Sequence, residues 1–370
     1  MQVINKICRC DNFATTPKNF LTTYSNPLSL PCMNITRFSL AAAFASSVLL
    51  TGVNGQPTTA TTDPVGFQTT PVAVGTTSLG NPLVNSNVIQ AGAAANTSSV
   101  VTLNGVDNVG SLLTAAEPYY IEVTDGALEG ERFDVDTAAT ILAGDSTVVL
   151  FAASPNNTAT LSPNVLAGSS IALRKHVTIE QLQAFFSPAL VGNNSAGSAD
   201  QISLYNNGTL TSYFLRSDNV TWRQVGTTTP ANKVVIPSGT GFFVTKRGSA
   251  SSFTSVGTVR MNDFAFPMPA GGTFRAPGFP VSYSPASLGG TATDGWTGSN
   301  SAGSADQLQV FNPGTGTFTS YFLRSDGVTW RQVGTTTTVT TDQLFADNNA
   351  FLVLRKTADQ NYILVNPVVQ

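Results

Sequence analysis

The sequence has little of the chemistry on which most enzymes and metal sites depend. Its 370 residues include one histidine and three cysteines, and only 11% of them are charged. A serine or cysteine triad would have to use His176. Zinc sites built from several histidine or cysteine ligands are excluded from a mature chain that, without residues 1–55, keeps no cysteine. The chain also lacks a G-x-S-x-G elbow, an H-E-x-x-H motif and a P-loop. We therefore expect no cofactor and no catalytic residue, and we place His176 at the surface or at a helix entry.

Basic charge is scarce as well. A net charge of −3 and a pI near 5.1 give no electrostatic footprint for nucleic acid, so no such partner is expected. The 32 glycines and 20 prolines, with abundant threonine, valine and serine, favour strands and tight turns over helices. Because 41% of the residues are hydrophobic, the chain can still build real cores. The composition thus predicts an all-β, mainly antiparallel fold.

The first 55 residues are predicted to be a leader rather than part of the fold. Residues 38–50 form an uncharged apolar run behind Arg37, and a run of this length matches the core of a secretory signal peptide. It is too short to span a bilayer, which needs ~20 residues. All three cysteines, Cys8, Cys10 and Cys32, lie in this leader. We expect the mature chain to have no membrane span and to be secreted or held in the cell envelope.

The sequence contains a long internal repeat, which fixes its organisation. Three pairs of segments align, the second pair with the single difference of Asn219 against Gly327: 195–201 with 301–307, 213–229 with 321–337, and 243–247 with 351–355.

These pairs predict two copies of one β-module. A Thr/Pro-rich linker (56–62) leads to the first module (63–260), which contains an inserted β subdomain at about 96–190. The second module (261–370) repeats residues 192–260 and adds its own opening strands. The insert is predicted to carry one short helix, which Thr178 caps and Ser187-Pro188 ends.

The repeated block reads as a hairpin. Asp218-Asn219 and Asp326-Gly327 occupy a two-residue turn between alternating runs, and a type I′ turn requires positive φ at both central residues. This register places Leu215 opposite Trp222 on an apolar face and Phe214 opposite Arg223 on the other face.

The chain resembles an uncharacterised family of exported repeat-containing proteins found mainly in Verrucomicrobia and related bacteria. The resemblance is carried by the segments 63–67 and 128–135 and by the paired Ser-Ala-Asp-Gln and Tyr-Phe-Leu-Arg-Ser-Asp blocks. It covers nearly the whole mature chain and implies export and a bacterial source. It brings no catalytic residue with it.

Three groups of residues are candidates for a site. The acidic region 117–136 could hold Ca²⁺ through oxygen ligands or supply a catalytic carboxylate pair, although a solvated hairpin edge is favoured. Asp200 and Asp306 could be ligands, but a role as turn residues that bond their own backbone is favoured. The hairpins could present a binding face of tryptophan and arginine, or the tryptophans could anchor the core while the arginines pair with Asp218 and Asp326. The calcium candidates are Glu122, Asp125, Glu131 and Asp134, and the binding candidates are Arg216, Asp218, Trp222, Arg223, Arg324, Asp326, Trp330 and Arg331.

From these patterns we predict an exported, non-enzymatic protein that serves as a structural or adhesive component of the envelope or extracellular space. Its partner would be an extracellular glycan or an envelope component. Copies of the chain could also assemble with one another through their strand edges. One alternative is a carbohydrate-binding module that stacks sugars on Trp222, Trp330 or Trp296. A second alternative is a carboxylate-based glycan hydrolase that uses acids of the 117–136 hairpin.

Overall fold

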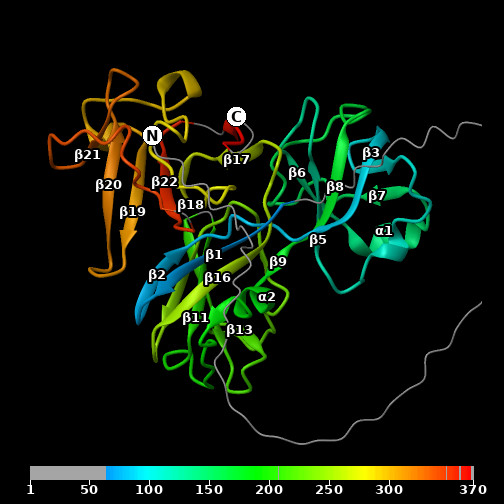
Figure 1. Cartoon of the computed structure of the whole chain (residues 1–370), viewed down its shortest axis with the longest axis horizontal. Helices are drawn as coiled ribbons and strands as arrows, with labels where there is room; N and C mark the ends of the chain where they lie inside the picture. The colour runs from blue at the N-terminus through cyan, green and yellow to red at the C-terminus, as the bar shows by residue number, and fades with distance from the viewer. Residues whose placement is uncertain (1–63, 207, 347, 358–359, 368–370) are drawn as a thin grey trace, which may run out of the picture. The chain divides into compact units, whose positions relative to one another are not determined.

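The computed structural model describes residues 64–206, 208–346, 348–357 and 360–367. The predicted leader (1–55), its signal core (38–50), the linker (56–62) and all three cysteines lie outside these residues. The described chain is built mostly from antiparallel β-sheets (Figure 1). The predicted all-β class is therefore confirmed.

Two five-stranded sheets run their strands in the same order. The first is ordered β13-β12-β11-β15-β2 and the second β21-β20-β19-β22-β18. The strands of the first sheet are β2 (Gly75–Leu79), β11 (Gln201–Asn206), β12 (Thr209–Leu215), β13 (Trp222–Gln224) and β15 (Phe242–Lys246). Those of the second are β18 (Gly271–Arg275), β19 (Gln307–Asn312), β20 (Thr317–Leu323), β21 (Trp330–Gln332) and β22 (Phe351–Arg355).

The structure corrects one segment of the sequence alignment by one residue. Gln201 pairs with Thr245 in the first sheet, and Gln307, its equivalent, pairs with Leu354 in the second. Lys246 therefore corresponds to Arg355, whereas the sequence alignment matched Arg247 with Arg355. A shift of one residue moves every side chain of a strand to the opposite face, so the correction decides which cation of each module is buried.

The inserted segment forms a six-stranded sheet of its own, ordered β6-β5-β8-β3-β4-β7. Its first strand begins at Asn87, earlier than the boundary near residue 96 that the sequence suggested. The strands are β3 (Asn87–Asn96), β4 (Val100–Leu103), β5 (Tyr119–Val123), β6 (Arg132–Val135), β7 (Thr147–Val149) and β8 (Ser170–Lys175).

Two α-helices occur in the described residues, where the sequence predicted one. The predicted helix is α2 (Ile179–Gln183), and the Thr178 side chain accepts a hydrogen bond from the Gln181 N–H at its start. The helix that was missed is α1 (Thr137–Ala143). Asp136 caps its first turn, and Gly144 ends it in the left-handed conformation with φ of 69°.

The remaining strands form three small sheets. β16 (Ser251–Thr258) lies between β1 (Val65–Val72) and β10 (Phe186–Ser187). β14 (Val235–Ile236) pairs with β9 (Val177–Thr178), and β17 (Phe264–Met268) pairs with β23 (Gln360–Leu364). Short 3₁₀ turns cover Gly110–Leu112, Ala292–Asp294 and Ala302–Ser304.

Each module and the insert has its own apolar core. The core of the first module contains Trp222, Phe242 and Phe253. The core of the second module contains Trp296 and Trp330. A smaller aromatic cluster lies between the modules, where Phe243 stacks on Phe274 with ring centroids 4.4 Å apart. Burial of these rings supplies the dominant stabilisation.

The hairpin register is confirmed, but its turn differs from the prediction. Leu215 pairs with Trp222 and Phe214 with Arg223. Only Asn219 (φ 57°), and not Asp218, has positive φ, so the turn is not type I′. Asp218 instead accepts hydrogen bonds from the backbone N–H groups of Val220 and Thr221, which holds a wider loop in the same register.

The single difference between the repeated blocks has a local cause. Gly327 has φ of 76°, and a Cβ added there would lie 2.7 Å from the Ala292 Cβ. Asn219 has room, and its side-chain oxygen accepts a hydrogen bond from the Gly192 N–H at 2.8 Å. The second module therefore requires glycine where the first uses asparagine.

Asparagine is expected to be tolerated less well at position 327 than at position 219, where the first module carries it. Gly327→Asn should lower the free energy of unfolding by about 1–3 kcal/mol, because the new side chain overlaps Ala292. Gly316→Asn is the matched control: Gly316 also has positive φ but has nothing within 4 Å of an added Cβ, so its change should stay under about 1 kcal/mol. Urea unfolding measures both. Equal losses would show that contact with Ala292 is not the cause.

Candidate functional site

The tryptophans of the repeated hairpins lie in the cores. Trp222 and Trp330 are both 0% exposed, and Trp296 is 3% exposed. The Trp222 indole N–H donates to Gln183 Oε1 at 2.7 Å, and that of Trp330 donates to the Gly290 carbonyl at 2.6 Å. These three rings therefore offer no stacking surface, and the sugar platform that the first alternative placed on them is wrong.

The expected pairing of the hairpin arginines with aspartate is also wrong. The Asp218 carboxylate accepts backbone N–H groups, and those hydrogen bonds lower its pKa to about 2. Hydrogen bonds from the Thr329 side chain and from the N–H groups of Thr329 and Val328 likewise lower the pKa of Asp326. The guanidinium of Arg324 donates instead to Asn300 Oδ1 at 3.2 Å. No ion pair joins Arg216, Arg223, Arg324 or Arg331 to these aspartates in the described structure.

Asp200 and Asp306 are neither turn residues nor ligands. Both are 0% exposed. Asp200 Oδ2 lies 2.5 Å from Lys246 Nζ, and Oδ1 accepts the Arg247 N–H at 2.7 Å. In the second module Asp306 Oδ2 lies 3.3 Å from Arg355 Nε, and Oδ1 accepts the Lys356 N–H at 2.6 Å. Each module thus contains one buried aspartate–cation pair at the same place.

The four calcium candidates do not converge. Asp125 is exposed and accepts hydrogen bonds from Ser170, while Asp134 is bound to His176. Glu131 is buried, and Glu122 is held by arginines. Among the described residues, no group of three or more His, Cys, Asp or Glu side chains could hold a metal ion. The predicted calcium site is therefore not formed.

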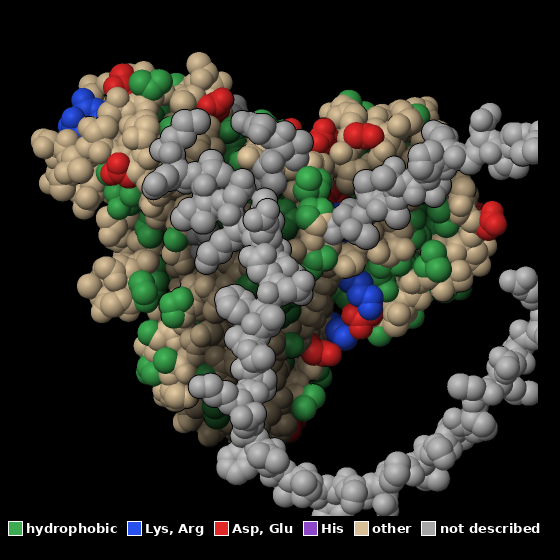
Figure 2. Space-filling model, in the orientation of Figure 1, with side chains coloured by type: hydrophobic (Ala, Val, Ile, Leu, Met, Phe, Trp, Pro, Cys, Tyr) green, Lys and Arg blue, Asp and Glu red, His purple; other side chains and the backbone are tan. Residues whose placement is uncertain are grey.

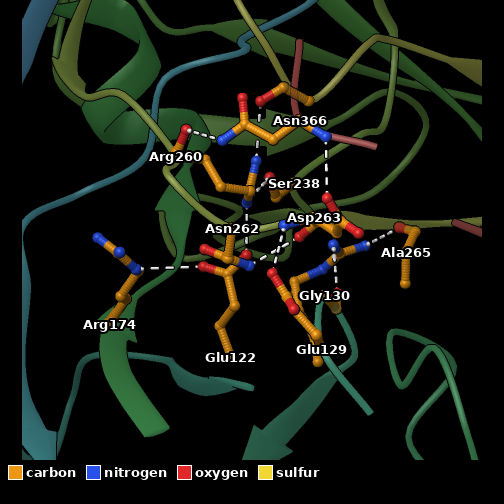
Figure 3. Close-up of polar contacts among 12 residues, drawn as sticks. Glu122, Glu129, Gly130, Arg174, Ser238, Arg260, Asn262, Asp263, Ala265 and Asn366 are labelled. Carbon is orange, nitrogen blue, oxygen red and sulfur yellow. Dashed lines mark hydrogen bonds and ion pairs between the residues drawn. The ribbon is translucent and has the colours of Figure 1, made fainter. Parts of the chain in front are cut away.

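Glu122 is the centre of a buried charge cluster (Figure 3). It projects from β5 and is 0% exposed. Arg260 Nε bonds one carboxylate oxygen, and Arg174 Nε on β8 lies 3.3 Å from the other. The contact between Arg174 Nε and Glu122 Oε2 is an ion pair, and its geometry is not that of a hydrogen bond. Because both arginines come from distant segments, sequence spacing gave no signal for them.

Arg260 connects three parts of the chain. It lies in the segment between β16 and β17, where the modules join. Besides Glu122 of the insert, it donates to Ser238 Oγ of the first module at 3.0 Å and to the Gly278 carbonyl of the second at 2.9 Å. One guanidinium therefore links the insert to both modules (Figure 3).

A second arginine completes the junction. Arg132 on β6 donates to the Ala265 carbonyl at 3.1 Å. Its guanidinium lies 4.3 Å from the centre of the Phe264 ring, and that of Arg260 lies 4.4 Å from the same ring. Such cation–π contacts are strongest when desolvated, as here.

The pKa values follow from burial and from this charge. Burial raises the pKa of Glu122, but Arg260, Arg174 and Arg132 outweigh it and hold the pKa below its usual range. Burial, together with repulsion from Arg260, lowers the pKa of Arg132 to about 10. Burial and the Glu122 charge raise the pKa of Tyr120 to about 12. The ionised carboxylate is thus the state that the folded protein stabilises.

His176 is buried rather than at the surface. Its Nε2 lies 2.8 Å from Asp134 Oδ1, and its ring lies 4.6 Å from that of Tyr120. Ser154 donates to the other Asp134 oxygen at 2.6 Å. A triad requires the serine to contact the histidine, whereas here both contact the aspartate. The adjoining cavity of about 20 Å³ has room for about one water molecule.

Acid is expected to destabilise the protein through Asp134 and Glu122. Burial raises the pKa of Asp134, but hydrogen bonds from His176, Ser154 and Asn156 hold it below its usual value. A carboxyl with a depressed folded-state pKa stabilises the fold above its unfolded pKa and loses this effect as the pH falls. The melting temperature should therefore drop below about pH 4, and less steeply in Asp134→Asn. If circular dichroism showed the same fall in melting temperature with pH in Asp134→Asn as in the unmodified chain, the prediction would be contradicted.

Comparison with known protein families, with curated proteins and with solved structures found no match. No helix among the described residues is both long and apolar enough to cross a membrane.

Proposed function

We propose that the chain is an exported, non-enzymatic protein that serves as a structural or adhesive component of the cell envelope or extracellular space. The apolar run at 38–50 supports export, as does the resemblance to exported repeat proteins. The predicted mature chain contains no cysteine, so it has no disulfide to hold its parts together outside the cell.

The junction arginine is the observation that carries this proposal. Arg260 contacts the insert, the first module and the second module from one buried position. The acids nominated for catalysis in region 117–136 include Glu122, whose carboxylate this arginine neutralises. A charge used in this way favours holding the modules together over reacting with a substrate.

The surface fits the same proposal. Charged side chains are sparse on the face seen in Figure 2, and backbone and side chains that are neither charged nor hydrophobic make up most of it. Such a surface suits contact with uncharged envelope material more than electrostatic capture of nucleic acid.

Export is tested by expressing the full chain in a bacterial host and locating the product. We expect a product that begins at Gln56, identified by mass spectrometry outside the cytoplasm. Phe44→Arg, which places a charge in the apolar run, should leave the intact chain in the cytoplasm. An intact cytoplasmic chain without the substitution would contradict export. Hydrolysis of a polysaccharide by the purified product would contradict a non-enzymatic role.

A further inference from the structure

A groove of about 510 Å³ lies where the first module meets loops of the second. One wall comes from β1 and β2, with Gln68, Thr70 and Thr77. The other comes from the second module, with Phe311 and Asn349. Figure 1 shows β1 and β2 beside the second module's sheet, and β2 contacts β19. The volume is that of sites for small ligands, which span ~300–1,000 Å³.

The lining of this groove carries no charge, and most of its residues have polar side chains. Its residues are threonine, serine, glutamine, asparagine, proline, alanine and one phenylalanine. Hydroxyl and amide groups donate and accept hydrogen bonds equally well. A charged ligand would lose its hydration here without gaining a counter-charge. The lining therefore selects an uncharged ligand with many hydrogen-bonding groups.

Two side chains on the groove wall have buried polar atoms that lack a partner. Thr77 is 7% exposed, and its hydroxyl has no hydrogen bond to any residue that the structure describes. The side-chain carbonyl of Gln68, on the inward face of β1, also has none. Buried polar groups are nearly always paired, so a ligand that reaches these two atoms from the groove would supply partners that the fold itself does not.

We propose that this groove binds a neutral oligosaccharide, which deepens the adhesive part of the proposed function and rests on it. Sugar hydroxyls pair with Thr77 and Gln68, while the half-buried ring of Phe311 offers an apolar contact. An extended peptide could instead add a strand to β1, which among the described strands pairs with β16 alone. Such a peptide would be held by backbone groups and would leave the side-chain oxygens unpaired, so the sugar is favoured.

Calorimetric titration of the full chain tests this assignment. The probes are maltohexaose, cellohexaose and chitohexaose, with a galacturonic acid hexamer as the charged control and a Thr-Val hexapeptide as the strand-forming control. We expect one neutral hexasaccharide to bind, and Thr77→Val to weaken its binding at least about fivefold. Thr76→Val is the matched control, because Thr76 is the neighbouring residue of β2 and does not line the groove.

Phe311→Ala is a second variant that does not depend on Thr77→Val folding. It should also weaken binding, whereas Phe67→Ala, which removes a 79% exposed ring on the outer face of β1, should not. Failure of all three neutral sugars to bind overturns the proposal, as does binding that Thr77→Val and Phe311→Ala leave unchanged. Binding of the peptide alone, or equal binding of the charged hexamer, also overturns it. If the protein is exported but binds no sugar, the assignment of the groove is wrong and export stands. If the chain binds sugar but stays in the cytoplasm, export alone is wrong.

Discussion

Replacing Glu122 with glutamine is expected to lower the free energy of unfolding by about 3–5 kcal/mol. The carboxylate lies between Arg260 and Arg174, and Arg132 adds a third positive charge nearby. Glutamine keeps the shape but removes the negative charge that Arg260 and Arg174 face in their buried positions. Removing one partner of a buried pair costs far more than the pair contributes relative to apolar residues.

The matched control is Glu117→Gln. Glu117 forms an ion pair with Lys233 at 2.8 Å, but the Lys233 side chain is 43% exposed. Exposed pairs contribute at most about 1 kcal/mol, so the control should differ little from the unmodified chain. Urea unfolding followed by circular dichroism compares the two. Similar losses would mean that burial of the Glu122 cluster does not govern its contribution.

Replacing Asp306 or Asp200 with asparagine should cost about 3–5 kcal/mol each. Each aspartate is buried, faces one cation and accepts backbone N–H groups from two segments. Asparagine retains one acceptor oxygen but leaves Lys246 or Arg355 as an uncompensated buried charge. The loss should be larger for Asp200, which bonds the Lys246 ammonium directly at 2.5 Å, than for Asp306, because its cation Arg355 lies 3.3 Å away and also donates to the Gly295 carbonyl.

Asp218→Asn and Asp326→Asn are the controls for this pair. Their carboxylates accept N–H groups at an exposed turn through a single oxygen, which asparagine also supplies. We expect changes within about 1 kcal/mol. If the turn substitutions lowered the free energy of unfolding more than the substitutions at Asp200 and Asp306, the structural role assigned to the two buried aspartates would be wrong.

Local patterns predicted the local structure. Alternation of apolar residues predicted the pairing of Leu215 with Trp222, because a strand has a period of two. Thr178 marked the start of α2 by its capping side chain. The caps of α1, Asp136 and Gly144, are also visible in the sequence. They were missed because Asp136 directly follows β6, so no loop separates the strand from the helix.

Contacts between distant segments were not predictable from spacing. Arg260 and Glu122 are separated by 138 positions, and no local pattern joins them. Glu122 within an apolar strand was the one available signal, because buried charges are usually paired. The cation partner of Asp306 was missed for a different reason. The sequence alignment matched 243–247 with 351–355, and only the strand pairing showed that Lys246 is the equivalent of Arg355.

Tryptophan accessibility tests the central claim, that the repeated tryptophans and aspartates hold the fold rather than form a surface site. Trp222, Trp296 and Trp330 are the three tryptophans of the chain and are all buried. We predict blue-shifted emission that acrylamide quenches little and that neutral oligosaccharides leave unchanged, because the groove lies apart from these rings. Red-shifted, readily quenched emission that sugars protect would contradict the account and return the tryptophans to a binding face.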